Sequence, residues 1–328
     1  MPDNNIRTIL LLTLFLLCIK CINTWSYNPL CLVTECCNND YIIDDVNSLR
    51  STLRSRVFGQ HLVETAVHAI WSHLHYHSQK PLTLSFHGWA GGGKNYVATF
   101  IAESLYKKGL QSKYVHNFIG RIHFPEVAHS RQYRENLYLW LKGNLTECPR
   151  QLFIFDEVHL MPQTVLNALK PLIDYRAMVD KVPYTEAIFI FLSNTGATVI
   201  NERYHELWSA GKQREEMKLS DFESLISRGA FNEKGGFQFS DAIKANLIDH
   251  YIPFLPMQEN HIIQCIKDQF TQRGVPSPKQ EHIKEVLEFV EWGPDDIKLY
   301  SKTGCKRISS KVAVIVAKHY PMRQKREL

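Results

Sequence analysis

The sequence has no strong charge bias, no internal repeat and no low-complexity segment. Its net charge is +5 over 328 residues, and no basic run carries interleaved aromatic side chains. Nucleic-acid binding is therefore not expected, because it requires a clustered basic surface. Hydrophobic residues make up 45 % and charged residues 22 % of the chain, which are ordinary globular values. The length allows one large domain, or one large and one small domain.

Several catalytic signatures are also absent from the sequence. No G-x-S-x-G, H-E-x-x-H or matched Cys/His nucleophile pattern occurs, which argues against the enzyme classes that those patterns define. His73 and His77 would share one helix face, but no third metal ligand follows at a recognisable spacing, and a solvated helix end explains them equally well. The vicinal pair Cys36-Cys37 is not a redox C-x-x-C motif and suits two separate disulfide partners.

The apolar run near the N-terminus is short. It covers Ile9 to Ile19 after Arg7, whereas a helix that crosses a membrane needs about 20 apolar residues. Such a run fits the core of a signal peptide. The residues that follow, Lys20 to Thr24, lack a small-residue cleavage pattern. We therefore expect residues 1–25 to be a signal peptide or a membrane-associating segment, and cleavage stays open.

Three further features point to the secretory pathway. The chain ends in KREL, Lys325 to Leu328, one substitution away from the KDEL retrieval signal. Asn144-Leu145-Thr146 is a glycosylation sequon. An even number of cysteines beyond the apolar run suits disulfides in an oxidising lumen. These are Cys31, Cys36, Cys37, Cys148, Cys265 and Cys305. Together the features predict the lumen of the endoplasmic reticulum, with Asn144 glycosylated.

Three short apolar runs predict buried parallel strands of an α/β sheet. They cover Pro81 to Phe86, Gln151 to Glu157 and Ala187 to Asn194. Amphipathic helices are expected at Phe58 to His77 and from Lys94 to about Gly109, where the glycine stops the helix. The polar residues of the strands fall at their carboxyl ends, which is the edge where open α/β sheets bind ligands.

The character of the chain changes near Pro253 to Pro256. Two amphipathic helical patterns follow, at 260–274 and 279–292, and Lys311 to Tyr320 fits either a strand or a helix. We therefore predict a large α/β nucleotide-binding domain over residues 26–255 and a small, mainly helical domain over residues 256–328.

The loop after the first predicted strand has the G-x-x-x-x-G-K frame of a phosphate-binding loop. It reads Gly88, Trp89, Ala90, Gly91, Gly92, Gly93 and Lys94. Its glycines permit backbone N–H groups to converge on phosphate oxygens, and the next helix aims its positive end at the same point. Lys94 would add a point charge on the β- and γ-phosphates. Asn95 replaces the usual Ser or Thr, but its carbonyl oxygen suits Mg²⁺ or a water on it.

Two carboxylates end the second predicted strand. Asp156 would hold Mg²⁺ of a bound MgATP, and Glu157 would act as general base on the attacking water. Alternatively, the pair merely ends a strand and starts a turn. Asn194, at the tip of the third strand, would orient that water or sense the γ-phosphate. The strand, loop and helix context favours the functional interpretation.

Six stretches in collinear order resemble the torsins, ATPases of the AAA+ class from the lumen of the endoplasmic reticulum and nuclear envelope. They are GWAGGGKN, FIFDEVHLMP, FIFLSNTGA, GKQREEMKL, NLIDHYIPFLP and TGCK. The likeness runs from about Cys31 to about Lys306, and an Asn after the loop lysine is itself a torsin trait. The loop departs from the torsin pattern at Ala90 and Gly92, where torsins commonly carry Thr. The smaller residues make the loop more flexible but remove no backbone N–H donor.

The resemblance implies a role for each site residue. Lys94 and Asn95 would end the Walker A motif, Asp156 and Glu157 would be the Walker B carboxylates, and Asn194 would be sensor 1. Lys306 would be sensor 2, reaching the γ-phosphate from the small domain. Cys265 and Cys305 would form a disulfide. This disulfide would either make nucleotide sensing depend on redox state or only stabilise the small domain. The cofactors implied are ATP and Mg²⁺.

The resemblance also implies partners. Torsins lack an arginine finger of their own, and a membrane protein of the lamina-associated polypeptide type supplies one from its luminal domain. By analogy with GTPases, such an arginine raises turnover by about 10³ to 10⁵. Arg203, Arg214 and Arg228 are expected to be surface or structural residues instead. Self-association and protein substrates are implied, and peripheral membrane contact stays open.

The function expected from the sequence is that of a luminal AAA+ ATPase that remodels protein complexes. One alternative is a nucleotide-gated scaffold that binds ATP and hydrolyses almost none. The intact Asp156-Glu157 pair argues against that alternative, whereas Asn95 and the missing finger argue for it. A second alternative is a small-molecule phosphotransferase, which would need an acceptor pocket and a lid arginine cluster that the sequence does not reveal.

Overall fold

The computed structural model describes residues 31, 33–174, 178–179, 182–238, 243 and 246–320. The expected N-terminal segment 1–25 and the KREL tail lie outside the described residues. Within the described part of the chain, no helix is both long enough and apolar enough to cross a membrane.

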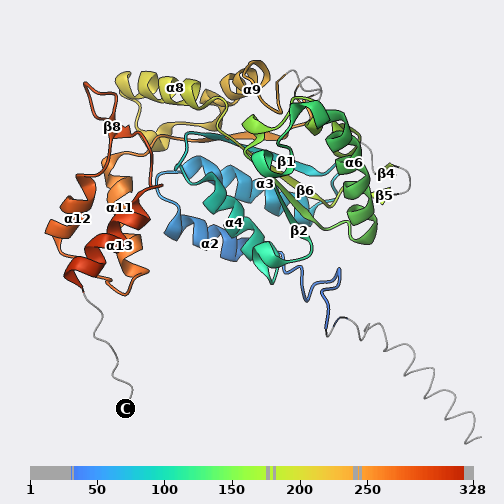
Figure 1. The fold of residues 1–328 in the computed structure, drawn as a ribbon, viewed down its shortest axis with the longest axis horizontal. Helices are drawn as coiled ribbons and strands as arrows, with labels where there is room; N and C mark the ends of the chain where they lie inside the picture. The colour runs from blue at the N-terminus through green and yellow to red at the C-terminus, as the bar shows by residue number, and fades with distance from the viewer. Residues whose placement is uncertain are drawn as a thin grey trace, which may run out of the picture.

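A five-stranded, wholly parallel sheet forms the centre of the molecule (Figure 1). The strand order is β2-β3-β6-β1-β7. The strands are β1 (Leu82–Gly88), β2 (Val115–Ile119), β3 (Leu152–Asp156), β6 (Ile188–Ser193) and β7 (His250–Phe254). All five carboxyl ends therefore meet at one edge, which is where an open parallel sheet places a ligand site.

Helices cover both faces of this sheet. On one face, α2 (Val46–Arg56), α3 (Glu64–His75) and α4 (Lys94–Leu105) form a single apolar cluster with the sheet. On the other face, α6 (Ser130–Glu147), α8 (Ala197–Ser209) and α9 (Glu223–Asn232) form a second cluster. Successive residues of β3 and β6 alternate between the two clusters, because side chains of a strand point to opposite faces. This explains why those strands are apolar throughout rather than alternating.

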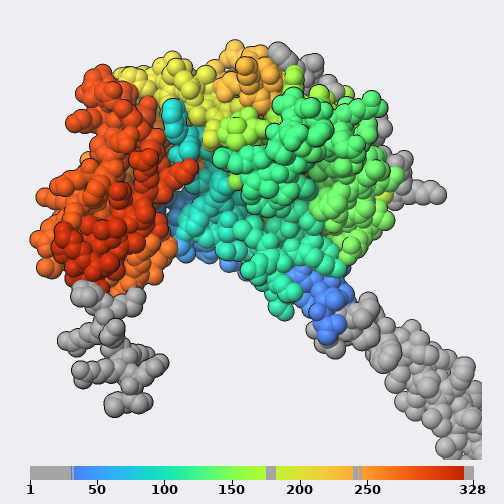
Figure 2. Space-filling model, viewed as in Figure 1, coloured from blue at the N-terminus to red at the C-terminus, as the bar shows by residue number. Residues whose placement is uncertain are grey.

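A helical unit follows the sheet and lies at one end of the molecule (orange and red in Figures 1 and 2). It contains α11 (Glu259–Thr271), α12 (Gln280–Leu287) and α13 (Ile308–His319), which share a third apolar cluster. A two-stranded hairpin, β8 (Trp292–Gly293) with β9 (Tyr300–Ser301), precedes α13. The run Lys311 to Tyr320, left open between strand and helix, lies almost wholly in α13. The domain division at residue 255 stays a prediction.

The short elements complete the fold. The helices α5 (Gly120–His123) and α7 (Lys170–Ile173) and the hairpin of β4 (Met178–Val179) with β5 (Val182–Pro183) lie in connections. The 3-10 turns are His61–Val63, Gly109–Gln111, Val127–His129, Val158–Leu160, Val165–Ala168, Arg214–Glu216 and Leu219–Asp221.

The structure corrects two predicted helix boundaries and adds elements that were not predicted. The helix expected to run from Lys94 to about Gly109 ends at Leu105. The helix expected from Phe58 begins at Glu64, because Gly59 has a positive φ of 68° and a 3-10 turn follows it. The helices α2, α6, α8 and α9 and the strands β2 and β7 were not predicted. Both strands lie at edges of the sheet, where half-exposed patterns and a proline such as Pro253 are tolerated.

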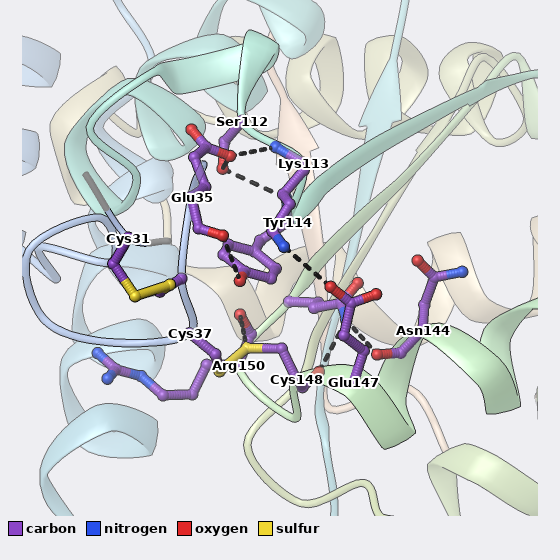
Figure 3. A network of polar contacts seen from close by, with 12 residues as sticks. Cys31, Glu35, Cys37, Ser112, Lys113, Tyr114, Asn144, Glu147, Cys148 and Arg150 are labelled. Carbon is purple, nitrogen blue, oxygen red and sulfur yellow. Dashed lines mark hydrogen bonds and ion pairs between the residues drawn. A yellow bond between two sulfur atoms is a disulfide. The ribbon is translucent and has the colours of Figure 1, made fainter. Parts of the chain in front are cut away.

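Three disulfides occur in the described residues: Cys31–Cys36, Cys37–Cys148 and Cys265–Cys305. The vicinal cysteines have separate partners, as predicted. Figure 3 shows how Cys37–Cys148 ties the described segment before α2, here called the N-terminal lead (residues 33–45), to the end of α6. The buried Glu35 carboxylate accepts hydrogen bonds from the Ser112 hydroxyl, at 3.1 Å, and the Lys113 amide, at 2.6 Å. The lead is therefore fixed covalently to the end of α6 and by a charge-assisted contact to the segment just before β2.

Asn144 lies within α6, near this lead (Figure 3). Its side chain is half-buried, and Nδ2 donates to the Trp140 carbonyl at 2.9 Å. Glycosylation at this nitrogen would replace that contact. It stays a prediction.

Candidate nucleotide-binding site

The glycine loop joins the carboxyl end of β1 to the first turn of α4, which begins at Lys94. Its backbone requires glycine at two close approaches. A Cβ on Gly88 would lie 2.5 Å from the Phe254 carbonyl oxygen, and one on Gly91 would lie 2.0 Å from the Thr303 carbonyl oxygen. Both residues also have positive φ, 146° and 86°. The sequence thus forms a loop that presents backbone N–H groups at a helix N-terminus, the geometry that binds phosphate.

Lys94 lies behind the loop with only 6 % of its surface exposed. Its Nζ donates to the carbonyl oxygens of Gly88 at 2.6 Å and Trp89 at 3.0 Å, and to Oδ1 of Asn194 at 3.0 Å. Burial lowers the pKa of Lys94 to about 8, partly offset by the attraction of Asp156. These three neutral oxygens engage all three N–H donors of the ammonium but leave its positive charge without a directly bonded anion, so a phosphate that replaced one of them would be strongly attracted. The loop lysine and the third-strand asparagine are therefore in direct contact.

The two carboxylates after β3 have different partners. Asp156 accepts from the Asn95 side-chain amide and, at 2.7 Å, from the Glu157 backbone N–H. Glu157 forms a two-pronged ion pair with Arg121, which lies in α5 after β2. The hydrogen bonds from this guanidinium hold the pKa of Glu157 below its usual value. Glu157 is thus ionised, and its carboxylate oxygens are engaged by Arg121.

Asn194 lies at the end of β6 and connects Lys94 to His159. Its Oδ1 accepts from Lys94, and its Nδ2 lies 3.2 Å from Nε2 of His159. The Asn194 backbone N–H also lies 3.4 Å from Nδ1 of this ring. Both of these groups are donors and a neutral imidazole accepts at one nitrogen only, so His159 accepts from Asn194 at one of the two positions and is neutral in this arrangement. Burial lowers the pKa of His159, which agrees with the neutral form.

The helical unit closes the site from the other side. The Cys305 backbone N–H donates to the Gly91 carbonyl at 3.1 Å, so the segment before α13 touches the glycine loop directly. Lys306 follows in the same segment and lines the cavity, as do Cys305 and its disulfide partner Cys265. The small unit therefore contributes a cation and a disulfide to the same space.

These elements enclose a cavity of about 440 Å³. Its lining includes every site residue predicted at this edge except Gly88 and Trp89: Ala90, Gly91, Gly92, Gly93, Lys94, Asn95, Asp156, Glu157, Asn194 and Lys306. The end of the cavity away from the glycine loop lies between α2 and α11. Its lining consists of Arg56, Val57, Phe58, Asp268 and Gln269. The volume and the mixed polar and apolar walls suit a nucleotide, with phosphates at the loop and a base at the other end.

Sequence reasoning missed Arg121, His159 and the wall formed by Arg56 to Phe58. Arg121 was missed because the strand before it was not recognised. His159 stands two residues after Glu157 in the DEVH stretch, and only the folded turn brings it to Asn194. The wall could not be found because it belongs to the unpredicted helix α2 and the turn after it.

The three arginines considered as fingers lie elsewhere. Arg203 pairs with Glu206, and Arg228 donates to the Ser224 carbonyl within its own helix. Arg214 is buried and donates to the carbonyls of Gly59 and Pro256. None of the three lines the cavity. Among the described residues, no three or more His, Cys, Asp or Glu side chains are grouped so that they could hold a metal ion, and this includes the surroundings of His73.

The sheet, the glycine loop on β1 and the helical unit over the cavity define an AAA+ P-loop fold. Solved structures share it: the S. cerevisiae Hsp104–ADP complex superposes with a TM-score of 0.55 at 16 % identity over 88 % of this chain. A closed state of Hsp104 with ATPγS and FITC casein gives 0.56 at 17 % identity over 85 %. The chain spans about half the length of these Hsp104 chains, 50 % and 47 %.

The chain belongs to the torsin family. The torsin family model matches residues 31–155. A Torsin-like protein of Drosophila melanogaster is 38 % identical over 293 residues, which cover 87 % of this chain and 86 % of the relative. A Torsin-like protein of Caenorhabditis elegans is 35 % identical over 296 residues, with 89 % and 83 % covered. The resemblance seen in the sequence motifs is confirmed.

Proposed function

We propose that this chain is an ATPase that binds ATP between the sheet and the helical unit and hydrolyses it. The observation that carries the proposal is the convergence of Lys94, Asn95, Asp156, Glu157, Asn194 and Lys306 on one cavity at the carboxyl edge of the sheet. Membership of the torsin family and the AAA+ fold support nucleotide binding.

The residues around the loop would bind and orient the phosphates. The backbone N–H groups from Gly91 to Asn95 and the Lys94 cation attract the β- and γ-phosphates, while Lys306 approaches from the other side. The oxygen ligands present, the Asp156 carboxylate and the Asn95 amide oxygen, suit Mg²⁺. Asn95 must turn its amide to offer that oxygen, because its nitrogen now faces Asp156. Bound Mg²⁺ would neutralise phosphate charge as the γ-phosphate leaves.

Glu157 would take the proton of the attacking water, with Asn194 positioning that water. In the present arrangement both oxygens of Glu157 are held by Arg121, so the base is not free to act. We infer that basal turnover is low for this reason. A membrane partner of the lamina-associated polypeptide type would complete the site with an arginine, because Arg203, Arg214 and Arg228 do not line the cavity. Arg56 does line it, but it pairs with Asp268 at the end that α2 and α11 form.

The hydrolysis would drive remodelling of protein complexes in the lumen of the endoplasmic reticulum and nuclear envelope. The family supports a luminal place, and the three disulfides suit an oxidising compartment. The Cys265–Cys305 disulfide lines the nucleotide cavity beside Lys306, so its reduction would change the wall that the nucleotide contacts.

The test is phosphate release from ATP by the full chain, alone and with the luminal domain of a candidate membrane activator. Glu157→Gln serves as the blank. We expect low basal turnover that rises steeply with the partner and disappears in the variant. Flat turnover in every sample, with ATP still bound, would instead establish a nucleotide-gated scaffold. The Arg121–Glu157 pair is the observation that favours this second function.

A further inference from the structure

His159 lies at the nucleotide cavity and has no part in the binding or the hydrolysis proposed above. It belongs to the 3-10 turn after β3 and lines the cavity together with Asn194. Both nitrogens of its ring face Asn194: Nε2 lies 3.2 Å from the side-chain Nδ2, and Nδ1 lies 3.4 Å from the backbone nitrogen. The two residues are 35 positions apart in the sequence, so the pairing of β3 with β6 brings them together.

The backbone at His159 is fixed by a neighbouring segment. The Gly236 N–H donates to the Val158 carbonyl at 2.9 Å. The glycine before it packs directly on the turn, since a Cβ on Gly235 would lie 2.8 Å from the Cα of His159. A side chain can orient another one only if its own backbone is held in place. His159 meets that condition.

The two ends of the Asn194 carboxamide have different partners. Lys94 can only donate, so it requires the oxygen, and Oδ1 lies 3.0 Å from its Nζ. The neutral His159 ring accepts at one nitrogen, and the shorter of its two distances is the one to Nδ2. That contact uses one hydrogen of the amide nitrogen. The second hydrogen is left for the cavity that Asn194 lines.

A bound γ-phosphate would disturb one of these contacts. The three N–H donors of Lys94 are taken by the oxygens of Gly88, Trp89 and Asn194, so a phosphate oxygen has to replace one of them. The first two belong to the backbone of the loop, whereas the third is on a carboxamide whose torsion is broad. Asn194 is therefore the partner that exchanges most easily. Among the described residues, His159 is then the remaining partner of its side chain.

We propose that His159 is a positioning residue for Asn194, and that it keeps the amide nitrogen of Asn194 turned toward the γ-phosphate. Phosphate oxygens are strong acceptors, so only this orientation gives an attractive contact. Without the imidazole acceptor the carboxamide is free to turn its oxygen toward the phosphate, where two acceptors repel each other. This inference rests on the proposed function, because it concerns a contact that ATP makes and ADP lacks.

The experiment compares the affinities of the full chain for ADP and for the β,γ-imido analogue of ATP, both with Mg²⁺, by calorimetric titration. The ratio isolates the γ-phosphate contact, whereas a fault in folding weakens both affinities. We expect His159→Leu to lower the preference for the analogue about fivefold, the effect of one hydrogen bond, with the ADP affinity unchanged. His159→Gln keeps an acceptor oxygen and should retain the preference. So should His68→Leu, at an exposed histidine that pairs with Glu64.

A double variant shows whether His159 acts through Asn194. Asn194→Ala should lower the preference for the analogue as well, and adding His159→Leu to it should lower the preference no further. Additive losses would show that His159 acts by another route and would overturn the proposal. A full preference for the analogue in His159→Leu would overturn it too.

Phosphate release with the candidate membrane activator separates this proposal from the proposed function. If the native chain preferred the analogue over ADP but released no phosphate, the proposed hydrolysis would fail, yet the binding ratios would still decide the role of His159. If the native chain released phosphate and His159→Leu kept the native ratio, this proposal alone would fail. Equal binding of the two nucleotides by the native chain, or binding of neither, would leave no γ-phosphate contact to support and would also overturn it.

Discussion

Among single residues, Arg121 affects the proposed hydrolysis most directly, because it contacts the proposed general base. Its guanidinium occupies both oxygens of Glu157, the residue proposed as the base. A carboxylate that already accepts two charge-assisted hydrogen bonds is a poor acceptor for a proton from water. The contact is exposed to solvent on the Arg121 side, so it can be exchanged without unfolding the core.

We expect Arg121→Leu to raise the basal rate of ATP hydrolysis, by at most roughly tenfold, because Glu157 is released. Phosphate release by the full chain measures this. Arg131→Leu is a matched control, since Arg131 is exposed and pairs only with Glu135 on its own helix. A rate equal to or below that of the native chain would show that Arg121 does not hold the base back.

His87 is a second single residue with a measurable effect, because it makes the free energy of unfolding depend on pH. It is fully buried on β1, donates through Nδ1 to the Thr195 carbonyl at 2.9 Å and accepts from the Ser85 hydroxyl at 2.6 Å. This arrangement needs the neutral ring. Burial lowers the pKa of His87 to about 4 from its ordinary 6.5. Below pH 6.5 the unfolded chain therefore binds a proton that the folded chain does not, and stability falls as pH falls toward 4.

Between pH 7 and pH 5 we expect His87 alone to remove about 2 kcal/mol from the free energy of unfolding. Urea unfolding at the two pH values measures it. The variant His87→Gln should lose that part of the pH dependence, while His77→Gln, at an exposed histidine, should keep it. His261, whose pKa burial also lowers to about 4, supplies a remaining slope in both variants. An identical slope in all three proteins would contradict the prediction.

At the scale of elements, the contact between the glycine loop and the segment before α13 decides how the helical unit meets the nucleotide. Gly91 and Gly304 pack backbone to backbone, and a Cβ on Gly304 would lie 2.4 Å from the Gly91 carbonyl oxygen. No side chain fits there without moving one segment away from the other. The position of Lys306, two residues later, depends on this contact.

We expect Gly304→Ala to weaken ATP binding by roughly tenfold through displacement of the segment that carries Lys306. Calorimetric titration of a non-hydrolysable analogue measures it. Gly211→Ala is the matched control: Gly211 also has positive φ, 86°, but nothing lies within 4 Å of its Cβ position. If Gly304→Ala bound the analogue as tightly as Gly211→Ala and the native chain, the contact between Gly91 and Gly304 would not be needed to position Lys306.

The strands differ in whether the sequence pattern predicts them. The strands β3 and β6 were predictable because both faces are buried and the sequence is apolar almost throughout. The strand β1 alternates leucine or phenylalanine with buried polar residues and was predictable from that pattern and the glycine loop after it. The edge strands β2 and β7 were not, since VHNFI mixes polar and apolar residues and HYIPF contains a proline. The motif residues of the loop and of β3 and β6 were predicted from the strand, loop and helix pattern, whereas Lys306 was predicted from the family resemblance. Arg121 and His159 were not, because tertiary packing alone brings them to Glu157 and Asn194.

At the scale of the whole molecule, a buried arginine joins the turn after α2 to the connection between β7 and α11. Arg214, 5 % exposed, donates to the Gly59 carbonyl through Nε at 2.7 Å and to the Pro256 carbonyl through Nη1 at 2.7 Å. Gly59 follows Phe58 and Pro256 precedes Met257, and both of those neighbours line the nucleotide cavity. The guanidinium thus sets the spacing of two cavity walls. Burial lowers its pKa, and its face also lies over the Tyr204 ring.

The last prediction concerns this junction. Arg214→Lys keeps the charge but cannot fork between two carbonyls, so one buried acceptor loses its partner, at a cost of about 1 to 3 kcal/mol. We expect a lower free energy of unfolding in urea and, because Phe58 and Met257 are no longer held at one spacing, weaker binding of a non-hydrolysable ATP analogue. Arg228→Lys, at an arginine that contacts only its own helix, should change neither by more than about 0.5 kcal/mol. Loss of stability with unchanged nucleotide affinity would show that Arg214 supports the fold without shaping the cavity.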